Sequence, residues 1–166
     1  MRLALSIAEQ DDAPELAALH NAAADDLTRR YGHGVWSTTA TEKGILFRWQ
    51  HVRVLIARKG KRIVGTLRLQ TKKPWAIHVK YFTPVKKAIY LTGMAVIPAM
   101  QRKGVGSLLL EEAARQALAW PVEAIRLDAF DTDAGAGGFY ARCGFREVGR
   151  VIYRRSPLIY FERVLV

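Results

Sequence analysis

The chain has 166 residues, of which half are hydrophobic and a quarter are charged, a composition typical of a folded protein with a core. This length suits one ordinary domain, so we expect a single domain over residues 1–166. No apolar run approaches the roughly 20 residues that cross a bilayer, and the apolar start turns acidic at Glu9, too early for a secretory signal. Its lone cysteine, Cys143, cannot form an internal disulfide. We therefore expect a cytoplasmic protein without a membrane partner.

Charge is the most unusual feature of the composition, because 26 basic residues face 15 acidic ones and leave a formal net charge of +11. Such a surface favours anionic partners. The basic residues occur in small clusters along the chain and form no long basic tail. We therefore do not expect nucleic acid to be a partner.

The first half of the chain alternates between helical and extended patterns. The sequence Thr39-Ala40-Thr41-Glu42 matches a capping box and predicts the start of the second helix. Lys59-Gly60-Lys61 joins two β-branched runs and predicts a hairpin. The expected elements are a strand at 2–8, a helix that ends near 31, a second helix that follows the capping box and reaches about 50, and strands at 52–57 and 63–69.

The second half continues the alternation. Residues 75–82 carry large side chains at alternate positions and form either an extra strand or an extended loop. Val105, Leu108, Leu109 and Ala113 give the long helix its apolar face. The remaining expected elements are strands at 88–96, 123–129, 145–153 and 158–165, and helices at 104–120 and 134–142. This order predicts an α/β protein with a mixed sheet flanked by helices.

A glycine-containing loop, residues 101–107, joins the strand at 88–96 to the long helix. The first N–H groups of a helix lack partners within it, and together with the helix dipole they attract anions. Gly104 and Gly106 would let a phosphate approach the backbone, and Arg102 and Lys103 add positive charge. The pattern predicts a pyrophosphate site.

Other readings of the glycine pattern are open at this point. The chain contains no P-loop sequence. A dinucleotide fingerprint would need a third glycine where Leu109 stands, although Asp128 lies about where its ribose-binding acid is sought. A Gly-x-Gly before a helix can also be a simple turn.

Two motifs together are more specific. The sequence Gln101-Arg102-Lys103-Gly104-Val105-Gly106 matches the Q/R-x-x-G-x-G/A pattern of the GNAT superfamily of acyltransferases. Residues 133–145, which include Phe139-Tyr140 and Gly144-Phe145, resemble that family's N-x-x-A-x-x-F-Y-x-x-x-G-F. The resemblance implies a mixed, mostly antiparallel sheet of about seven strands, with a splay between strands 4 and 5 and about four flanking helices.

The resemblance also implies an activity, the transfer of an acetyl group from acetyl-CoA to a primary amine by direct attack in a ternary complex, without a metal. Met94, Ala95 and Val96 would offer main-chain hydrogen bonds to the pantetheine. The positions that would bind the rest of the coenzyme are Gln101, Arg102, Lys103, Gly104, Val105, Gly106, Ser107 and Asp133. Asp133 stands where the family has Asn. Two roles stay open for its side chain, a contact with the ligand and the cap of the following helix.

Tyr140 matches the family's thiolate-facing tyrosine and is the expected general acid; the alternative is a core aromatic beside Phe139. Asp128 is the candidate general base; the alternative is a salt bridge with Arg126 or Arg150. His78 has a suitable ordinary pKa, but we expect an exposed spectator. We expect Cys143 to be a small packed residue and not a nucleophile.

The acceptor amine has no signature in the sequence. Its side of the site would be built from the first two helices and the insertion at 70–87, which combines aromatic and basic residues that would suit an acceptor bearing an acidic group. The same insertion could instead form a homodimer contact. A non-catalytic acyl-CoA-binding module that contacts nucleic acid or protein is the alternative function.

Overall fold

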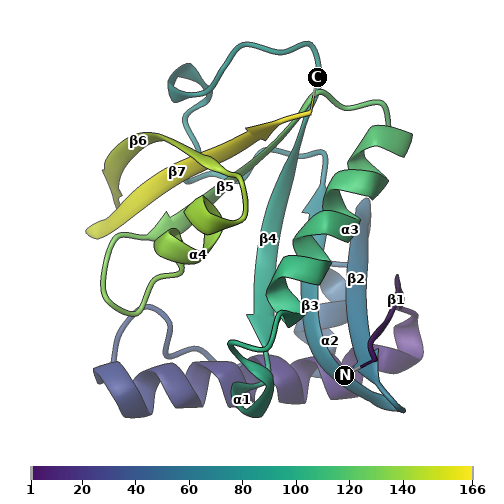
Figure 1. The fold of residues 1–166 in the computed structure, drawn as a ribbon. Coiled ribbons are helices and arrows are strands. Elements are labelled where there is room, and N and C mark those ends of the chain that lie inside the picture. The colour runs from purple at the N-terminus through teal and green to yellow at the C-terminus, as the bar shows by residue number, and fades with distance from the viewer. Residues whose placement is uncertain (1, 166) are drawn as a thin grey trace. The chain divides into compact units, whose positions relative to one another are not determined.

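The fold is described by a computed structural model, which covers residues 2–165 (Figure 1). The helices are α1 (Ala13–Tyr31), α2 (Glu42–Phe47), α3 (Val105–Ala119) and α4 (Gly137–Arg142). The strands are β1 (Ala4–Ile7), β2 (Val52–Lys59), β3 (Arg62–Gln70), β4 (Ala88–Val96), β5 (Ala124–Phe130), β6 (Arg146–Tyr153) and β7 (Ser156–Val164).

The strands form one seven-stranded sheet in the order β1-β2-β3-β4-β5-β7-β6. The pairs β1–β2, β5–β7 and β6–β7 are antiparallel, whereas β4 and β5 are parallel. The β4–β5 ladder joins Ala88–Tyr90 to Ala124–Arg126, and both strands continue beyond it, to Val96 and Phe130. The predicted fold class, a mixed α/β fold with a seven-stranded sheet and four helices, is confirmed.

Backbone contacts divide the chain into two compact units. Unit 1 comprises Met1–Leu69 and Thr92–Ala113, and unit 2 comprises Gln70–Leu91 and Ala114–Val166. Both β4 and α3 therefore begin in one unit and end in the other. The single domain over residues 1–166 stays a prediction.

In unit 1, α3 packs on β3 through a glycine. A Cβ added to Gly65 would lie 2.7 Å from a Val105 methyl and 2.9 Å from a Leu109 methyl, so only glycine lets the helix come this close. Side chains alternate along a strand, so Arg68 points to the face opposite Gly65 and away from α3. On the same unit, the Glu15 carboxylate of α1 accepts a hydrogen bond of 2.7 Å from the Ile63 amide.

Unit 2 has its own core around Tyr160, which is fully buried together with Ile77 and nearly buried Phe82. Ile77 and Phe82 belong to the insertion at 70–87, which is a loop with a single 3₁₀ turn at Val79–Tyr81 and not an extra strand. The Tyr160 hydroxyl donates to the Ala76 carbonyl and accepts from the His78 amide at 3.2 Å. The insertion therefore completes the core of unit 2.

Most predicted elements lie within a few residues of the observed ones, but three details are wrong. Helix α2 is capped by Thr41, whose hydroxyl accepts a 3.0 Å hydrogen bond from the Gly44 amide, and not by Thr39. Leu108 is 46% exposed, and Leu110 instead joins the buried face of α3. Helix α4 begins only at Gly137, because the turn before it folds back on Phe130, whose carbonyl would lie 1.9 Å from a Cβ on Gly135.

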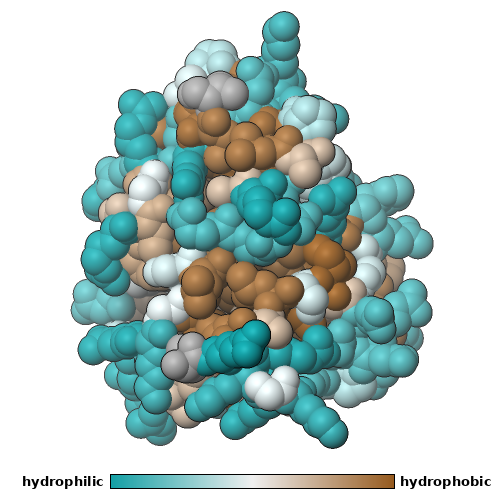
Figure 2. All heavy atoms as spheres, turned by 45° about the vertical axis from the view of Figure 1, so that its right-hand side comes forward, coloured by the Kyte–Doolittle hydropathy of each residue, from teal (hydrophilic) through white to brown (hydrophobic). Residues whose placement is uncertain are grey.

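The surface mixes both kinds of side chain. Figure 2 shows hydrophobic residues that reach the surface among hydrophilic ones. Within residues 2–165, no helix combines the length and the apolar character that a membrane span requires.

Candidate active site

The part of β4 in unit 1 begins with an irregularity. Gly93 has φ +59°, a left-handed conformation that is rare inside a strand and typical of a bulge. A Cβ at this position would lie 2.7–2.9 Å from the guanidinium atoms of Arg68. Met94, Ala95 and Val96, the predicted pantetheine partners, follow directly and are half-buried. Glycine at position 93 thus allows β4 to turn and Arg68 to lie over its backbone.

The loop after β4 is held at both ends. The Ile97 amide donates to the Val64 carbonyl at 2.9 Å, and the Gln101 side chain donates to the Val96 carbonyl at 3.1 Å. Gln101 therefore braces the end of β4. Because that hydrogen bond uses the Val96 carbonyl, Val96 can offer a ligand its amide more readily than its oxygen.

Two left-handed residues shape the predicted pyrophosphate loop. Arg102 has φ +60° and Gly104 has φ +86°. For an arginine this conformation costs about 1 kcal/mol or more. Such alternation turns successive backbone N–H groups toward one side, the arrangement of an anion-binding nest. The side chains of Arg102 and Lys103 are exposed beside it.

Helix α3 begins immediately after this loop. The Leu108 amide makes its first intrahelical hydrogen bond, 3.1 Å to the Gly104 carbonyl, so the amides of the first turn point out of the helix end. Val105 is buried against β3, which fixes the helix end, while Ser107 is exposed and Gly106 is half-buried. Val105 can therefore contribute only its backbone to a ligand.

Tyr140 lies in unit 2, on α4, and is buried. Its ring packs against Phe145 and Phe161, with centroids 5.8 Å and 6.0 Å away. Burial raises the pKa of its phenol, and the negative charge of Asp128 and the Cys143 thiol raise it further. Tyr140 is consequently both a packed aromatic, as the alternative interpretation held, and a phenol that keeps its proton at neutral pH.

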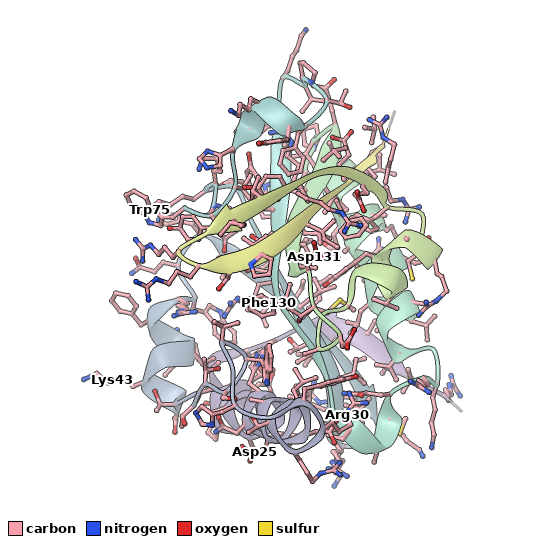
Figure 3. The ribbon with its side chains drawn as sticks, turned by 90° about the vertical axis from the view of Figure 1, so that its left-hand side faces the viewer. Asp25, Arg30, Lys43, Trp75, Phe130 and Asp131 are labelled. Carbon is pink, nitrogen blue, oxygen red and sulfur yellow. The ribbon has the colours of Figure 1, made fainter. Side chains whose placement is uncertain are left out.

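Asp128 lies on β5 opposite Tyr160 and is half-buried. Burial raises the pKa of its carboxyl group, which moves it toward the range of a general base. The alternative salt bridges are wrong within the described residues: Arg126 donates to Tyr90 and Thr83, and Arg150 pairs with Glu147 and Asp131. Asp131, which is labelled in Figure 3, directly follows the end of β5.

The other unit 2 candidates are peripheral. Asp133 is exposed, and of its two open roles the helix cap is wrong because the N-cap of α4 is Ala136. His78 is exposed, as expected. Cys143 is the half-buried C-cap residue of α4, again as expected.

Unit 1 also contains a cavity of about 280 Å³ that the sequence did not predict. It lies between α1, the loop before α2, α2 itself, β3 and β4. The lining residues are His20, Thr38, Thr39, Ala40, Thr41, Gly44, Ile45, Arg48, Arg68 and Gly93. The one signal for this cavity in the sequence is Gly93, inside the predicted strand at 88–96. A glycine within a strand suggests a bulge or the close approach of another group to the backbone. Among residues 2–165, no group of His, Cys, Asp or Glu is placed to hold a metal.

Comparisons with known proteins agree on one family. The model of the Acetyltransferase (GNAT) family matches residues 6–145. Over 70 residues the chain is 30% identical to GCN5-related N-acetyltransferase 10, chloroplastic, of Arabidopsis thaliana, a match that covers 42% of this chain and 27% of that relative. The chain thus spans only about a quarter of the curated relative's length.

Two solved structures have the same fold. The ribosomal-protein-alanine N-acetyltransferase of Brucella melitensis has a TM-score of 0.75 and 19% identity, covering 98% of this chain and 99% of that one. The PaiA N-acetyltransferase of Thermoplasma acidophilum, in complex with coenzyme A, has a TM-score of 0.73 and 15% identity, covering 99% of each chain. Because the family model matches most of this chain, the chain belongs to the GNAT family of acetyltransferases.

Proposed function

We propose that the protein transfers an acetyl group from acetyl-CoA to a primary amine by direct attack in a ternary complex. The observation that carries the proposal is the junction of β4 and α3 in unit 1. There the first turn of α3, the left-handed Arg102 and Gly104, and the cations of Arg102 and Lys103 combine in one anion-binding loop. Coenzyme A is a polyanion, and its pyrophosphate fits such a loop.

Several properties of the loop support the fit. Space beside Gly104 is open, since a Cβ added there would have no atom within 4 Å. Gln101 holds the strand end and Val105 anchors the helix, so the amides are oriented before a ligand arrives. Preorganisation of this kind lowers the entropy cost of binding. Met94, Ala95 and Val96 would then hold the pantetheine and the acyl carbonyl along the strand.

The chemical step needs an unprotonated amine and a proton for the departing thiolate. Asp128, with its raised carboxyl pKa, is the group we assign to removing the proton, directly or through water. Tyr140, with its raised phenol pKa, stays protonated and can donate to the sulfur as negative charge develops there. The electrostatic influence of Asp128 on Tyr140 means that the charge states of the two groups are linked.

The proposal is tested by measuring coenzyme A release from acetyl-CoA with and without a panel of primary amines. We expect release to depend on an amine, and acetyl-CoA to raise the melting temperature in proportion to the logarithm of its excess over Kd. In Gly106→Glu, a carboxylate at the anion site should abolish the thermal shift and the turnover. The matched control is Gly138→Glu on α4, an exposed position far along the chain from the loop.

Tight coenzyme A binding by Gly106→Glu in calorimetry would show that the loop is not the site. Binding without amine-dependent turnover would instead favour a non-catalytic acyl-CoA-binding module. Cytoplasmic location and the absence of nucleic acid partners stay part of the same proposal.

A further inference from the structure

The cavity in unit 1 has a fixed wall. The Asn21 side chain of α1 donates to the Ala40 carbonyl at 2.9 Å and accepts from the Ala40 amide at 2.7 Å. Thr41 caps α2, and the Thr28 and Ser37 hydroxyls are hydrogen-bonded at 2.6 Å. The loop that connects α1 to α2 is thereby tied to α1 on one side and to α2 on the other. Hydrogen bonds within the protein therefore hold this wall of the cavity.

The cavity is lined by cationic side chains and by no Asp or Glu among its described lining residues. Burial, together with the positive charges of Arg68 and Arg48, lowers the pKa of His20 to about 4. Burial and the charge of Arg48 also lower the pKa of Arg68. The charged groups that lower these two pKa values are both arginines. An anion in the cavity would relieve this repulsion.

Arg68 is held where it can meet a ligand. Its Nε donates to the Thr92 hydroxyl at 3.3 Å, and its guanidinium lies over the backbone of Gly93. A guanidinium is a planar fork of donors that matches a carboxylate or phosphate in a two-point contact. The other cation, Arg48, is the C-cap of α2 and is exposed at the same cavity.

The cavity adjoins the strand segment to which the thioester would bind. Gly93 lines the cavity and directly precedes Met94, Ala95 and Val96. Consecutive strand residues are about 3.3 Å apart, so Ala95 lies roughly 7 Å along the strand from Gly93. A group held by Arg68 and an amine that attacks beside Ala95 would then be separated by only a few bonds.

We propose that this cavity binds a carboxylate or phosphate group of the acceptor, so that the substrate is a small amine with an anionic group a short spacer away. The inference rests on the proposed acetyl transfer and adds the substrate class. The volume of about 280 Å³ suits such a group and a few carbon atoms. Polycationic amines are excluded by the charges of Arg48 and Arg68.

The experiment compares matched acceptors at saturating acetyl-CoA: glycine with glycinamide, β-alanine with its amide, and 2-aminoethylphosphonate with ethylamine. We expect kcat/KM to be about 10- to 100-fold higher for the anionic member of at least one pair, the range for hydrogen bonds to a charged group. Arg68→Met and Arg48→Met should each reduce this preference, mainly through KM, while the Kd of acetyl-CoA stays unchanged. Arg48 is exposed, so its variant should fold even if Arg68→Met does not.

Lys43→Met is the matched control, because Lys43 lies on α2 but extends away from it and does not line the cavity (Figure 3). It should keep the full preference. Equal kcat/KM for both members of every pair, with amine acetylation intact, would overturn the anion site and leave the proposed function standing.

A second measurement does not depend on turnover. With the pyrophosphate loop saturated by coenzyme A, the melting temperature is measured at increasing concentrations of methylphosphonate or propionate. Either anion should stabilise the wild type and Lys43→Met, and neither should stabilise Arg68→Met or Arg48→Met. No stabilisation of the wild type would overturn the anion site even if acetylation failed for other reasons.

Discussion

Arg68 in unit 1 and Arg126 in unit 2 are both strand arginines, the first half-buried and the second buried, but their neighbours differ. Arg126 is 4% exposed and donates to the Tyr90 hydroxyl at 3.2 Å and the Thr83 carbonyl at 2.9 Å. It also lies 5.1 Å from the centre of the Phe82 ring. Arg68 lies in a cavity beside Arg48 and His20.

The same contrast holds for the surroundings of each arginine. Near Arg126, the Glu162 carboxylate accepts from the Thr83 amide at 2.7 Å and pairs with Arg146 at 3.4 Å, so positive and negative charges occur together. Near Arg68, the charged groups that shift pKa values are cations alone. In unit 2, Glu162 and Arg146 pair within the protein, whereas in unit 1 the cations beside the cavity have no acidic group among the cavity's lining residues, an arrangement that indicates an anionic ligand. We therefore expect changes in unit 1 to alter binding and changes in unit 2 to alter stability or chemistry.

Tyr140→Phe should give the largest effect, a loss of catalytic rate. It sharpens the contrast because it changes chemistry in unit 2 without changing binding. The variant keeps the ring packing against Phe145 and Phe161 and loses only the hydroxyl. We expect the single-turnover rate to fall about 10²- to 10³-fold, within the usual range for a lost acid catalyst, with unchanged affinity for acetyl-CoA and acceptor. Single turnover is required because slow product release would hide the loss in kcat. A wild-type single-turnover rate would reduce Tyr140 to a packing residue.

Arg126→Met should give the next largest effect, a loss of stability. Its comparison with Arg68→Met tests whether Arg126 is structural and Arg68 is not. Removal of Arg126 leaves the buried Tyr90 hydroxyl and the part-buried Thr83 carbonyl without their donor, at a cost of about 1–3 kcal/mol for a fully buried group and less for a part-buried one. We expect the free energy of unfolding to fall by about 2–4 kcal/mol in urea denaturation at constant m-value. Arg68→Met, which removes a cation from among cations, should change it by less than about 1 kcal/mol. A larger loss in Arg68→Met would mean that Arg68 is structural.

Elements with strong local signals were predictable from sequence. The limits of α1 and β4 follow from Asp12-Ala13-Pro14 at the helix start, Gly32 after its end, and a long β-branched and aromatic run, and the structure matches both. The family's two motifs also located the β4–α3 loop. Its left-handed Arg102 was not predictable, because arginine rarely adopts that conformation and the cost is met by the surrounding loop.

Features that depend on distant side chains were not predictable. Arg48 and Arg68 look like ordinary surface cations until folding brings them to one cavity with His20. The insertion at 70–87 looked like an acceptor or dimer surface because of its aromatic and basic residues. Ile77 and Phe82 are instead buried around Tyr160, a residue far away in the sequence. Any role of the insertion in acceptor choice stays a prediction, and shortening it would also remove part of the unit 2 core.

Glu162→Gln should give the smallest effect and tests the matched charge in unit 2. Burial alone would raise the pKa of the Glu162 carboxyl group, but hydrogen bonds from Thr83 and the nearby Arg146 outweigh it, and the pKa lies below its ordinary value. The unfolded protein therefore takes up this proton more readily than the folded one. The resulting stabilisation is complete above the unfolded pKa of about 4.3 and is lost as the pH falls through the lower folded value.

Glu162→Gln removes this titration and keeps an oxygen that can accept from the Thr83 amide. We expect the free energy of unfolding at pH 7 to drop by about 1 kcal/mol, and the difference from wild type to shrink as the pH is lowered from about 5 to about 3. Urea denaturation over this pH range measures it. Glu147→Gln is the control, because Glu147 is also paired with an arginine but is exposed, and exposed pairs contribute little. A difference for Glu162→Gln that stays constant down to pH 3 would show that Glu162 contributes through packing and not through its charge.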